Sequence, residues 1–535
     1  MNSFINKLVT HQIYRKFDRI EPVLFVIVAI LSVIPVFLVT CFPTLDGPSH
    51  LYNSNLIIEL IKGNRHIAQV FSLNSFAVPN WSGHAILAFF NFFLPAIMAE
   101  KILIGFYAIG LPLVFRMFIR QLKGDIAIAW LIFPFTFSFM FYLGFYNFCL
   151  GTLFFFWGLY VWLKNQEKPL KRNLLAFLFS VLIFYSHIVV FAIFVFTLFC
   201  ILINDLYRET RIQKKPLLKI FFIKAVWLVI AFLPAGIMGL IYIISNFTPN
   251  NGSRIEPGEL LTWLYNIRSI VAFNFGREGT FTITCFGLIM FLILMSVFIS
   301  VYKKLGKKEH LSSKSDISVV WLFLAGTMLG LYFILPDEIG SGGYISVRLN
   351  WFFFIYIIVW LSKERFYPWI RVSIVCIVLF IHIGLMFHHN KYVYGFNVYS
   401  GKVIEASKYI EPNSVVLPYN FSNQWLLKHF SNYLGIDKPL IILENYEAST
   451  GYFPVKWNDI TLPQYCLHGN DSLKYCSFIR HSQNSVKRNI DYLFFIGNHP
   501  DTSDKCIYNI LKYSYSHCKE VYRSSTVVLF KCKAY

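Results

Sequence analysis

The chain has 535 residues, of which 56% are hydrophobic, 19% aromatic and only 14% charged. With a mean hydropathy of +0.55, most of it cannot fold as a water-soluble globule. A formal net charge of +20 would suit nucleic-acid binding in a soluble protein, but here the basic residues form short runs between apolar stretches. This is the positive-inside pattern of membrane proteins. Composition therefore indicates a multi-pass membrane protein whose partner is the lipid bilayer and not a nucleic acid.

Apolar windows long enough to cross a hydrocarbon core of about 30 Å predict about eleven transmembrane helices. We expect them near residues 22–42, 101–120, 125–143, 147–163, 173–185, 188–204, 220–245, 281–302, 317–335, 349–362 and 370–387. The first window lacks a small-residue cleavage site after it, so we interpret it as a retained anchor. The apolar stretch 84–98 is shorter and contains Pro95, which predicts an interfacial or re-entrant helix on the outer side.

The distribution of Lys and Arg predicts the orientation. Basic residues gather at the N-terminus and in alternate loops, around 116–123, 164–172, 208–224, 303–314 and 363–371, while the intervening loops carry few. The positive-inside rule then places the N-terminus in the cytoplasm and, after eleven spans, the C-terminus outside it. We expect an integral protein of the bacterial inner membrane.

The last part of the chain predicts a separate domain. Beyond residue 388, helix-like stretches at 401–410 and 425–434 alternate with strand-like stretches at 414–418, 440–443, 491–496 and 526–530. We therefore expect a transmembrane domain at 1–387 and an extracytoplasmic α/β domain at 388–535. The segments 429–435 and 443–457 are rich in aromatic and amide side chains, which suit contact with a sugar or a peptide. Packing against the membrane surface is the simpler explanation.

Five cysteines lie in this C-terminal part. In an oxidising compartment they would form two disulfides and leave one free thiol. Short sequence separations favour Cys466 with Cys476 and Cys506 with Cys518, although connectivity is not determined by sequence alone.

The first candidate for chemistry is Asp46, in the run Leu45-Asp-Gly-Pro-Ser-His50 just past the first span. A carboxylate at the outer mouth of a span, with its backbone fixed by Gly47-Pro48 and a histidine four residues later, suits a general base. The alternative is that Asp46 only caps the helix that follows.

This motif, followed by several spans and a C-terminal outer domain, resembles the GT-C superfamily of membrane glycosyltransferases. The resemblance implies a polyprenyl-phosphate-linked sugar as donor, inversion at the sugar, Asp46 as the base, and transfer on the extracytoplasmic side. The acceptor, whether glycan, lipid or protein, stays open. Many members carry two acids in this loop, whereas Asp46 has no acidic neighbour. Hard divalent cations need several oxygen ligands, so we expect no cofactor or metal site, although a divalent cation stays open.

The leaving phosphate needs a cation, and the candidate is Arg348. It follows a glycine-rich outer segment, 340–343, at the start of a late span, and an arginine can contact a phosphate through two hydrogen bonds. The alternative is an arginine that only reaches up to the membrane interface. In GT-C enzymes the outer loop before a late helix supplies phosphate-binding basic residues, which favours the functional interpretation.

Three further residues complete the predicted substrate-binding set. His187 sits in an otherwise uncharged turn between two spans, where a titratable group is costly unless it faces a cavity or interfacial water. His50 and Arg268 also lie on the predicted outer side, with solvation of the loops as the alternative.

Two other functional classes stay open. A lipid or solute transporter or flippase would predict paired repeats or broken helices in matching halves, and charges deep within spans; the sequence shows neither pattern. A polysaccharide polymerase or ligase of another membrane fold would place its arginines in one large outer loop. The loop at 246–280, with Arg254, Arg268 and Arg277, fits that description.

Overall fold

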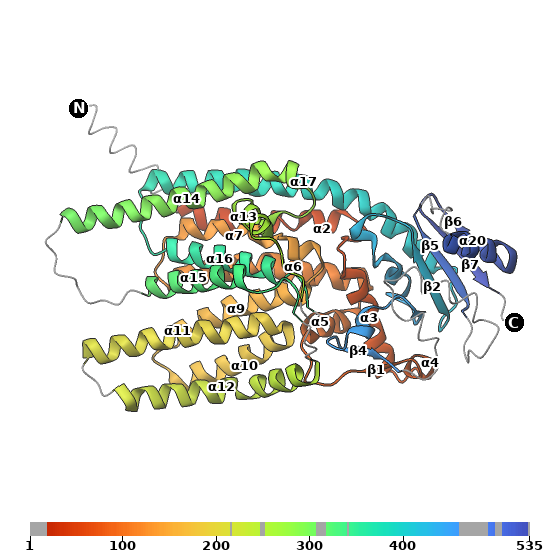
Figure 1. The fold of residues 1–535 in the computed structure, drawn as a ribbon, viewed down its shortest axis with the longest axis horizontal. Helices are drawn as coiled ribbons and strands as arrows, with labels where there is room; N and C mark the ends of the chain where they lie inside the picture. The colour runs from red at the N-terminus through yellow and green to blue at the C-terminus, as the bar shows by residue number, and fades with distance from the viewer. Residues whose placement is uncertain are drawn as a thin grey trace.

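The computed structural model describes residues 19–213, 217–246, 252–306, 317–339, 342–458, 490–497 and 505–532. Figure 1 shows a long bundle of helices joined at one end to a smaller part that contains a β-sheet. Within the described residues, seven helices are long and apolar enough to cross a membrane, and three shorter apolar helical segments accompany them. The protein is therefore built mainly as an integral membrane bundle.

Each predicted span coincides with a helical segment. In chain order these are Arg19–Leu38, which ends in α2 (Ile34–Leu38), α6 (Ala96–Gln121), the broken run η1 (Ile126–Leu131), α7 (Ile132–Thr136) and α8 (Phe139–Tyr142), α9 (Tyr146–Lys164), α10 (Pro169–Ser186), α11 (Ile188–Gln213), α12 (Leu217–Asn246), α14 (Phe275–Gly306), α15 (Ser318–Ile334), α16 (Ile345–Leu361) and α17 (Pro368–Ser407). A small helix, α13 (Pro257–Tyr265), and the turn η2 (Arg268–Ile270) lie between α12 and α14. The number of these helices that cross the bilayer stays a prediction.

Two segments differ from a simple span. The stretch predicted as one interfacial helix is divided, because α5 (Trp81–Asn91) ends before Pro95 and α6 begins directly after it. Proline lacks the N–H that a helix interior needs but is tolerated at a helix start. Helix α17 continues past the expected boundary at 387/388 and carries the chain from the bundle into the C-terminal part (Figure 1).

The C-terminal part contains a five-stranded sheet in the order β3-β2-β5-β7-β6. Its strands are β2 (Val415–Asn420), β3 (Ile441–Ile442), β5 (Tyr492–Ile496), β6 (Cys518–Arg523) and β7 (Val527–Cys532). Strands β2, β3 and β5 are parallel, and β7 runs antiparallel to β5 and β6. Every residue of β5 is buried, as expected for a strand covered on both faces.

Four of these strands were predicted, namely β2, β3, β5 and β7, whereas β6 and the preceding helix α20 (Lys505–His517) were not. The predicted helix at 425–434 consists instead of two 3₁₀ turns, η3 (Trp425–Leu427) and η4 (Phe430–Gly435).

The first outer loop is packed into the C-terminal part. This loop contains α3 (Gly47–Ile61), α4 (Arg65–Ala68) and β1 (Phe71–Leu73), and β1 pairs antiparallel with β4 (Val455–Trp457). The buried Tyr52 hydroxyl on α3 donates to the Leu440 carbonyl oxygen at 2.7 Å and accepts from the Ile442 amide at 3.0 Å. A short helix, α18 (Glu447–Thr450), lies in the same region. The two predicted domains therefore share an interface built from segments nearly 400 residues apart.

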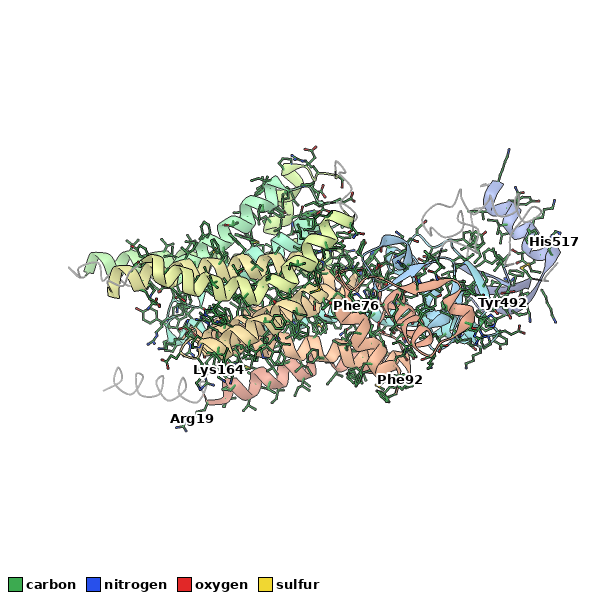
Figure 2. The ribbon with its side chains drawn as sticks, turned by 90° about the horizontal axis from the view of Figure 1, so that it is seen from below. Arg19, Phe76, Phe92, Lys164, Tyr492 and His517 are labelled. Carbon is green, nitrogen blue, oxygen red and sulfur yellow. A yellow bond between two sulfur atoms is a disulfide. The ribbon has the colours of Figure 1, made fainter. Side chains whose placement is uncertain are left out.

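The ends of the molecule fit the predicted orientation. In Figure 2, Arg19 and Lys164 lie at the end of the bundle far from Tyr492 and His517, which belong to the C-terminal part. Basic residues assigned to the cytoplasmic side are thus opposite the domain assigned to the outside; which side faces the cytoplasm stays a prediction.

The disulfide prediction for Cys506 and Cys518 was wrong. Cys518 is bonded to Cys532, 14 residues later, because β6 and β7 place these two residues opposite each other with their Cα atoms 4.1 Å apart. Sequence distance alone does not reveal strand pairing. Cys466 and Cys476 lie outside the described residues.

We expect Cys532→Ser to lower the free energy of unfolding of the C-terminal part by about 3 kcal/mol, since the bond closes a loop of about 15 residues. Thermal unfolding of the purified protein, with and without reductant, measures this loss. Peptide mapping under non-reducing conditions should recover Cys518 linked to Cys532, and a peptide linking Cys518 to Cys506 would contradict the assignment.

Candidate functional site

A cavity of about 490 Å³ lies where the first outer loop, the bundle and the C-terminal part meet. Four of the five predicted site residues line it: Asp46, His50, His187 and Arg348. Its other lining residues are Leu45, Pro79, Asn80, Phe145, Asn147, Phe148, Ile188, Val189, Tyr242, Ile243, Asn246, Ile339, Gly342, Gly343, Tyr344, Ile345, Lys428, Tyr446, Tyr452 and Phe453. The cavity is therefore largely apolar, with a few polar and charged groups directed into it.

Asp46 immediately precedes α3 but does not cap it. Its side chain makes no capping hydrogen bond; the Gly47 amide instead donates to the Thr44 hydroxyl oxygen at 3.1 Å. A side chain at Gly47 would meet Thr44 Oγ1 at 2.3 Å and Glu100 Oε1 at 2.7 Å, which explains the glycine. The capping alternative thus does not account for Asp46, whose carboxylate is left to the cavity.

The electrostatic surroundings of Asp46 suit proton transfer. Burial raises the pKa of its carboxyl group above the ordinary value of 3.8, and the neighbouring His429 and His50 partly offset that rise. A base of this kind takes a proton more readily than an exposed aspartate, because burial makes its charged form less stable.

Arg348 lies in the first turn of α16 and is only 7% exposed. Its guanidinium lies over the rings of Phe145 and Phe148, 5.2 and 5.8 Å from their centroids. Its Nε is buried without a hydrogen-bond partner, and no described carboxylate forms a salt bridge with it. Such burial does not fit an arginine that reaches out to the interface. An anionic ligand bound in the cavity would offset the free-energy cost of burying the positive charge of Arg348.

His187 separates α10 from α11 and packs edge-on against Phe148, with ring centroids 5.4 Å apart. Its Nδ1 is buried without a partner. Beside it, Asn147 and Asn80 line the cavity. Asn147 is held by the Gly83 amide and the Asn80 carbonyl, and Asn80 donates to the Tyr452 carbonyl oxygen, so among these three side chains His187 is the one with a buried nitrogen left for a ligand.

Arg268, the fifth predicted residue, does not line this cavity. Its guanidinium stacks on Phe139, 3.8 Å from the ring centroid, and its Nη1 donates to the Val271 carbonyl oxygen at 2.6 Å. Burial lowers the pKa of Arg268 to about 10. In this position the side chain fixes the loop between α13 and α14.

The sequence analysis missed a buried acidic residue at the centre of the interface. Glu447, fully buried at the start of α18, has Oε1 2.7 Å from His50 Nδ1 and Oε2 2.7 Å from His84 Nε2. Asn53 on α3 also donates to Oε2 at 3.0 Å. Burial alone would raise the pKa of Glu447, but the two histidines outweigh it and lower the pKa to about 2.

His50 is the charged partner of this carboxylate. Its Nε2 is within hydrogen-bond distance of the Gly144 carbonyl oxygen, at 2.9 Å, while its Nδ1 lies 2.7 Å from Glu447 Oε1 at an ion-pair distance without the angle of a hydrogen bond. Burial opposes a charge on His50, but Glu447 outweighs it and raises the pKa of the imidazole. His50 therefore both pairs with Glu447 across the interface and lines the cavity.

The ligand atoms of His50, His84 and Glu447 lie within 4.8 Å of one another, so these three could hold a divalent cation. Their nitrogen and carboxylate donors are the types that zinc accepts. The same contacts also form a buried ion pair without a cation. Of this cluster, the sequence singled out His50 as a residue, and Glu447 only as part of the aromatic and amide-rich segment 443–457, which lies here against the first outer loop.

Neither a family model nor a curated protein matches the sequence. Among solved structures, the chain is similar to ArnT from Cupriavidus metallidurans bound to undecaprenyl phosphate, with 11% identity, a TM-score of 0.50, and coverage of 95% of this chain and 97% of that one. Apo ArnT from the same organism gives a TM-score of 0.52 with the same identity and coverage. ArnT is a GT-C glycosyltransferase. The chain has the GT-C fold. This confirms the fold that the sequence resemblance predicted, over nearly the whole chain.

We expect Glu447→Gln to destabilise the protein by about 3–5 kcal/mol, because it leaves the charged His50 buried without its counter-ion. Thermal unfolding in detergent, followed by intrinsic fluorescence, measures the change. The matched control is Glu411→Gln, since the Glu411 side chain is 69% exposed where it pairs with Lys531; it should change stability by less than about 0.5 kcal/mol. If the two substitutions changed stability by the same amount, Glu447 would contribute no more to the free energy of unfolding than an exposed glutamate does.

Proposed function

We propose that this chain is an integral membrane glycosyltransferase. It transfers a sugar from a polyprenyl-phosphate-linked donor to an acceptor on the extracytoplasmic side, with inversion, and the acceptor is a glycan, lipid or protein. Asp46 is the base, Arg348 binds the donor phosphate, and His187 and His50 lie along the sugar or acceptor path.

One observation carries this proposal: a single cavity joins a buried carboxylate without a capping role to a buried arginine that forms no salt bridge with any carboxylate among the described residues. The two come from opposite ends of the chain's membrane part, Asp46 before α3 and Arg348 in α16. A transfer reaction needs both groups at one site, because one accepts a proton while the other stabilises a leaving anion. ArnT, which shares the fold, was solved with undecaprenyl phosphate bound.

The apolar lining suits the rest of such a donor. Ile188 and Val189 on α11 and Ile243 on α12 line the cavity on its membrane side. Many α12 side chains are exposed and apolar, which in a membrane protein means contact with lipid. A prenyl chain could therefore extend from the phosphate at Arg348 into the bilayer without crossing polar surface.

The reaction follows from these positions. The acceptor's nucleophilic atom attacks the anomeric carbon and gives its proton to Asp46, while the bond from that carbon to the phosphate oxygen breaks. The electron pair leaves with the polyprenyl phosphate, whose charge Arg348 stabilises. Attack opposite the leaving group inverts the anomeric configuration.

Asp46→Asn should lower turnover by roughly 100- to 10,000-fold, because the amide cannot accept the proton. The assay follows release of undecaprenyl phosphate by the purified protein, offered a panel of undecaprenyl-phosphate-linked sugars and membrane acceptors. Asp46 makes no capping hydrogen bond but lies beside His429, so thermal unfolding of the variant is measured in parallel to show that it is folded. A folded variant with close to parental turnover would overturn the assignment of Asp46 as the base.

Arg348→Ala should weaken binding of undecaprenyl phosphate by about 10- to 100-fold, which corresponds to the loss of charge-assisted hydrogen bonds worth about 1.5–3 kcal/mol. Arg348→Lys should lose less, because lysine keeps the charge but not the planar fork. Thermophoresis in detergent gives the dissociation constants. The control is Arg277→Ala, an exposed arginine on the same predicted side. If the Arg348 and Arg277 variants bind undecaprenyl phosphate equally well, the phosphate lies elsewhere.

A further inference from the structure

A histidine from the C-terminal part lies beside Asp46. His429, directly before η4, is 5% exposed, and its Nε2 lies 3.8 Å from Asp46 Oδ1. The Tyr446 ring stacks on its imidazole, with centroids 4.3 Å apart, and so fixes the ring plane. The candidate base is thus supplied by the first outer loop, while its nearest cationic neighbour comes from a segment more than 380 residues later.

The other face of this histidine is held by a second buried carboxylate. His429 Nδ1 lies 2.5 Å from Glu444 Oε1, and Glu444 Oε2 accepts hydrogen bonds from Ser431 Oγ at 3.0 Å and Asn432 Nδ2 at 2.7 Å. Asn432 also donates to Ser49 on α3 at 3.0 Å. Glu444 is therefore fixed by three donors and tied to the helix that Asp46 precedes.

Both ring nitrogens of His429 face carboxylate oxygens. The Glu444 contact is at hydrogen-bond distance, whereas the 3.8 Å separation from Asp46 Oδ1 is an ion-pair distance, across which His429 acts electrostatically and not through an N–H···O bond. Carboxylates on both sides also compensate a buried positive charge, which would otherwise be costly. The geometry thus places His429 in a row between two buried carboxyl groups, those of Glu444 and Asp46.

We propose that His429, oriented by Glu444, is a positioning residue that keeps Asp46 ionised and correctly placed to accept the proton of the sugar acceptor. This inference rests on the proposed function, since it assumes that Asp46 is the base. A buried carboxylate without such a cation would hold its own proton and could not act as a base. The C-terminal part then has a catalytic purpose, because it completes the site that the membrane part begins.

Few other groups near Asp46 can stabilise its ionised carboxylate. The titratable groups that face it or influence it are His429, His50, Glu447, Tyr446, Tyr344 and Tyr452. His50 forms an ion pair with Glu447. Burial raises the pKa of Tyr446 well above its ordinary value, so the phenol of Tyr446 stays neutral. Glu447 thus holds His50 and Glu444 holds His429, and among the described residues His429 is the basic group within 4 Å of an Asp46 carboxyl oxygen.

The test measures kcat/KM against pH for the parent, His429→Gln and Glu444→Gln, with release of undecaprenyl phosphate as the readout. Asp46 works only when unprotonated, so activity falls as pH drops through its pKa. Removing the cation raises that pKa further, and the acidic limb should move to higher pH by about one unit or more in both variants. Their loss of activity should therefore be at least 10-fold at low pH and should shrink as pH rises.

A purely structural role predicts a different result. His429→Gln would then lower activity by the same factor at every pH and leave the acidic limb in place, which would overturn the proposal. Glu444→Gln is nearly isosteric, and its amide oxygen can still accept from Ser431 and Asn432 while its NH2 group replaces the carboxylate oxygen that faces His429, so it provides the same test if the histidine variant does not fold. His66→Gln, at an exposed position, is the control and should match the parent profile.

Asp46→Asn separates this inference from the function on which it rests. If Asp46→Asn is fully active, the proposed base is wrong and the role of His429 falls with it. If Asp46→Asn is inactive while both other variants keep the parental profile, only the role of His429 is wrong. Support for both requires that Asp46→Asn combined with His429→Gln lose no more activity than Asp46→Asn alone.

Discussion

A carboxylate that is removed from water must be compensated by cations or donors, and this constraint shapes the whole outer end of the protein. Glu447 meets it by binding His50 from α3 and His84 from α5, with Asn53 as a further donor. None of these partners is near Glu447 in sequence. The charge of one residue therefore fixes the first outer loop and the C-terminal part in a single arrangement, and the cavity is the space enclosed by that arrangement.

The cavity separates its charges in a way that suits group transfer. Arg348 lies at the start of α16, over two phenylalanine rings and without a salt bridge to any carboxylate that the structure describes. Asp46 lies on the side of the C-terminal part, beside His429. A direct Asp46–Arg348 pair would neutralise both groups. Because the two groups do not pair with each other, both can serve the roles proposed for them, Asp46 as the base and Arg348 as the phosphate-binding group.

The apolar character of the sequence explains why the bundle was predictable. In a bilayer, each backbone polar group must be satisfied within its own helix, so a long apolar stretch has little choice of structure. The predicted strands β2 and β5 followed from a similar argument, because short runs of buried β-branched and aromatic residues favour parallel central strands. The break between α5 and α6 at Pro95 also has a local cause. By contrast, strand β1 has three residues, and only its pairing with β4 makes it a strand.

The sequence by itself predicted the helical membrane bundle and the strands β2, β3, β5 and β7, and it named Asp46, His187 and Arg348 as candidate site residues from their positions at the outer ends of spans. Only the tertiary structure decided which of the predicted residues share a cavity: it placed Arg268 against Phe139 and brought in His84, Glu447, His429 and Glu444. The physical reason is that apolar periodicity is a local property, readable within about 20 residues. The cost of a buried charge is instead offset by the groups that the fold brings within about 3–4 Å of it. These groups can be far from it along the chain.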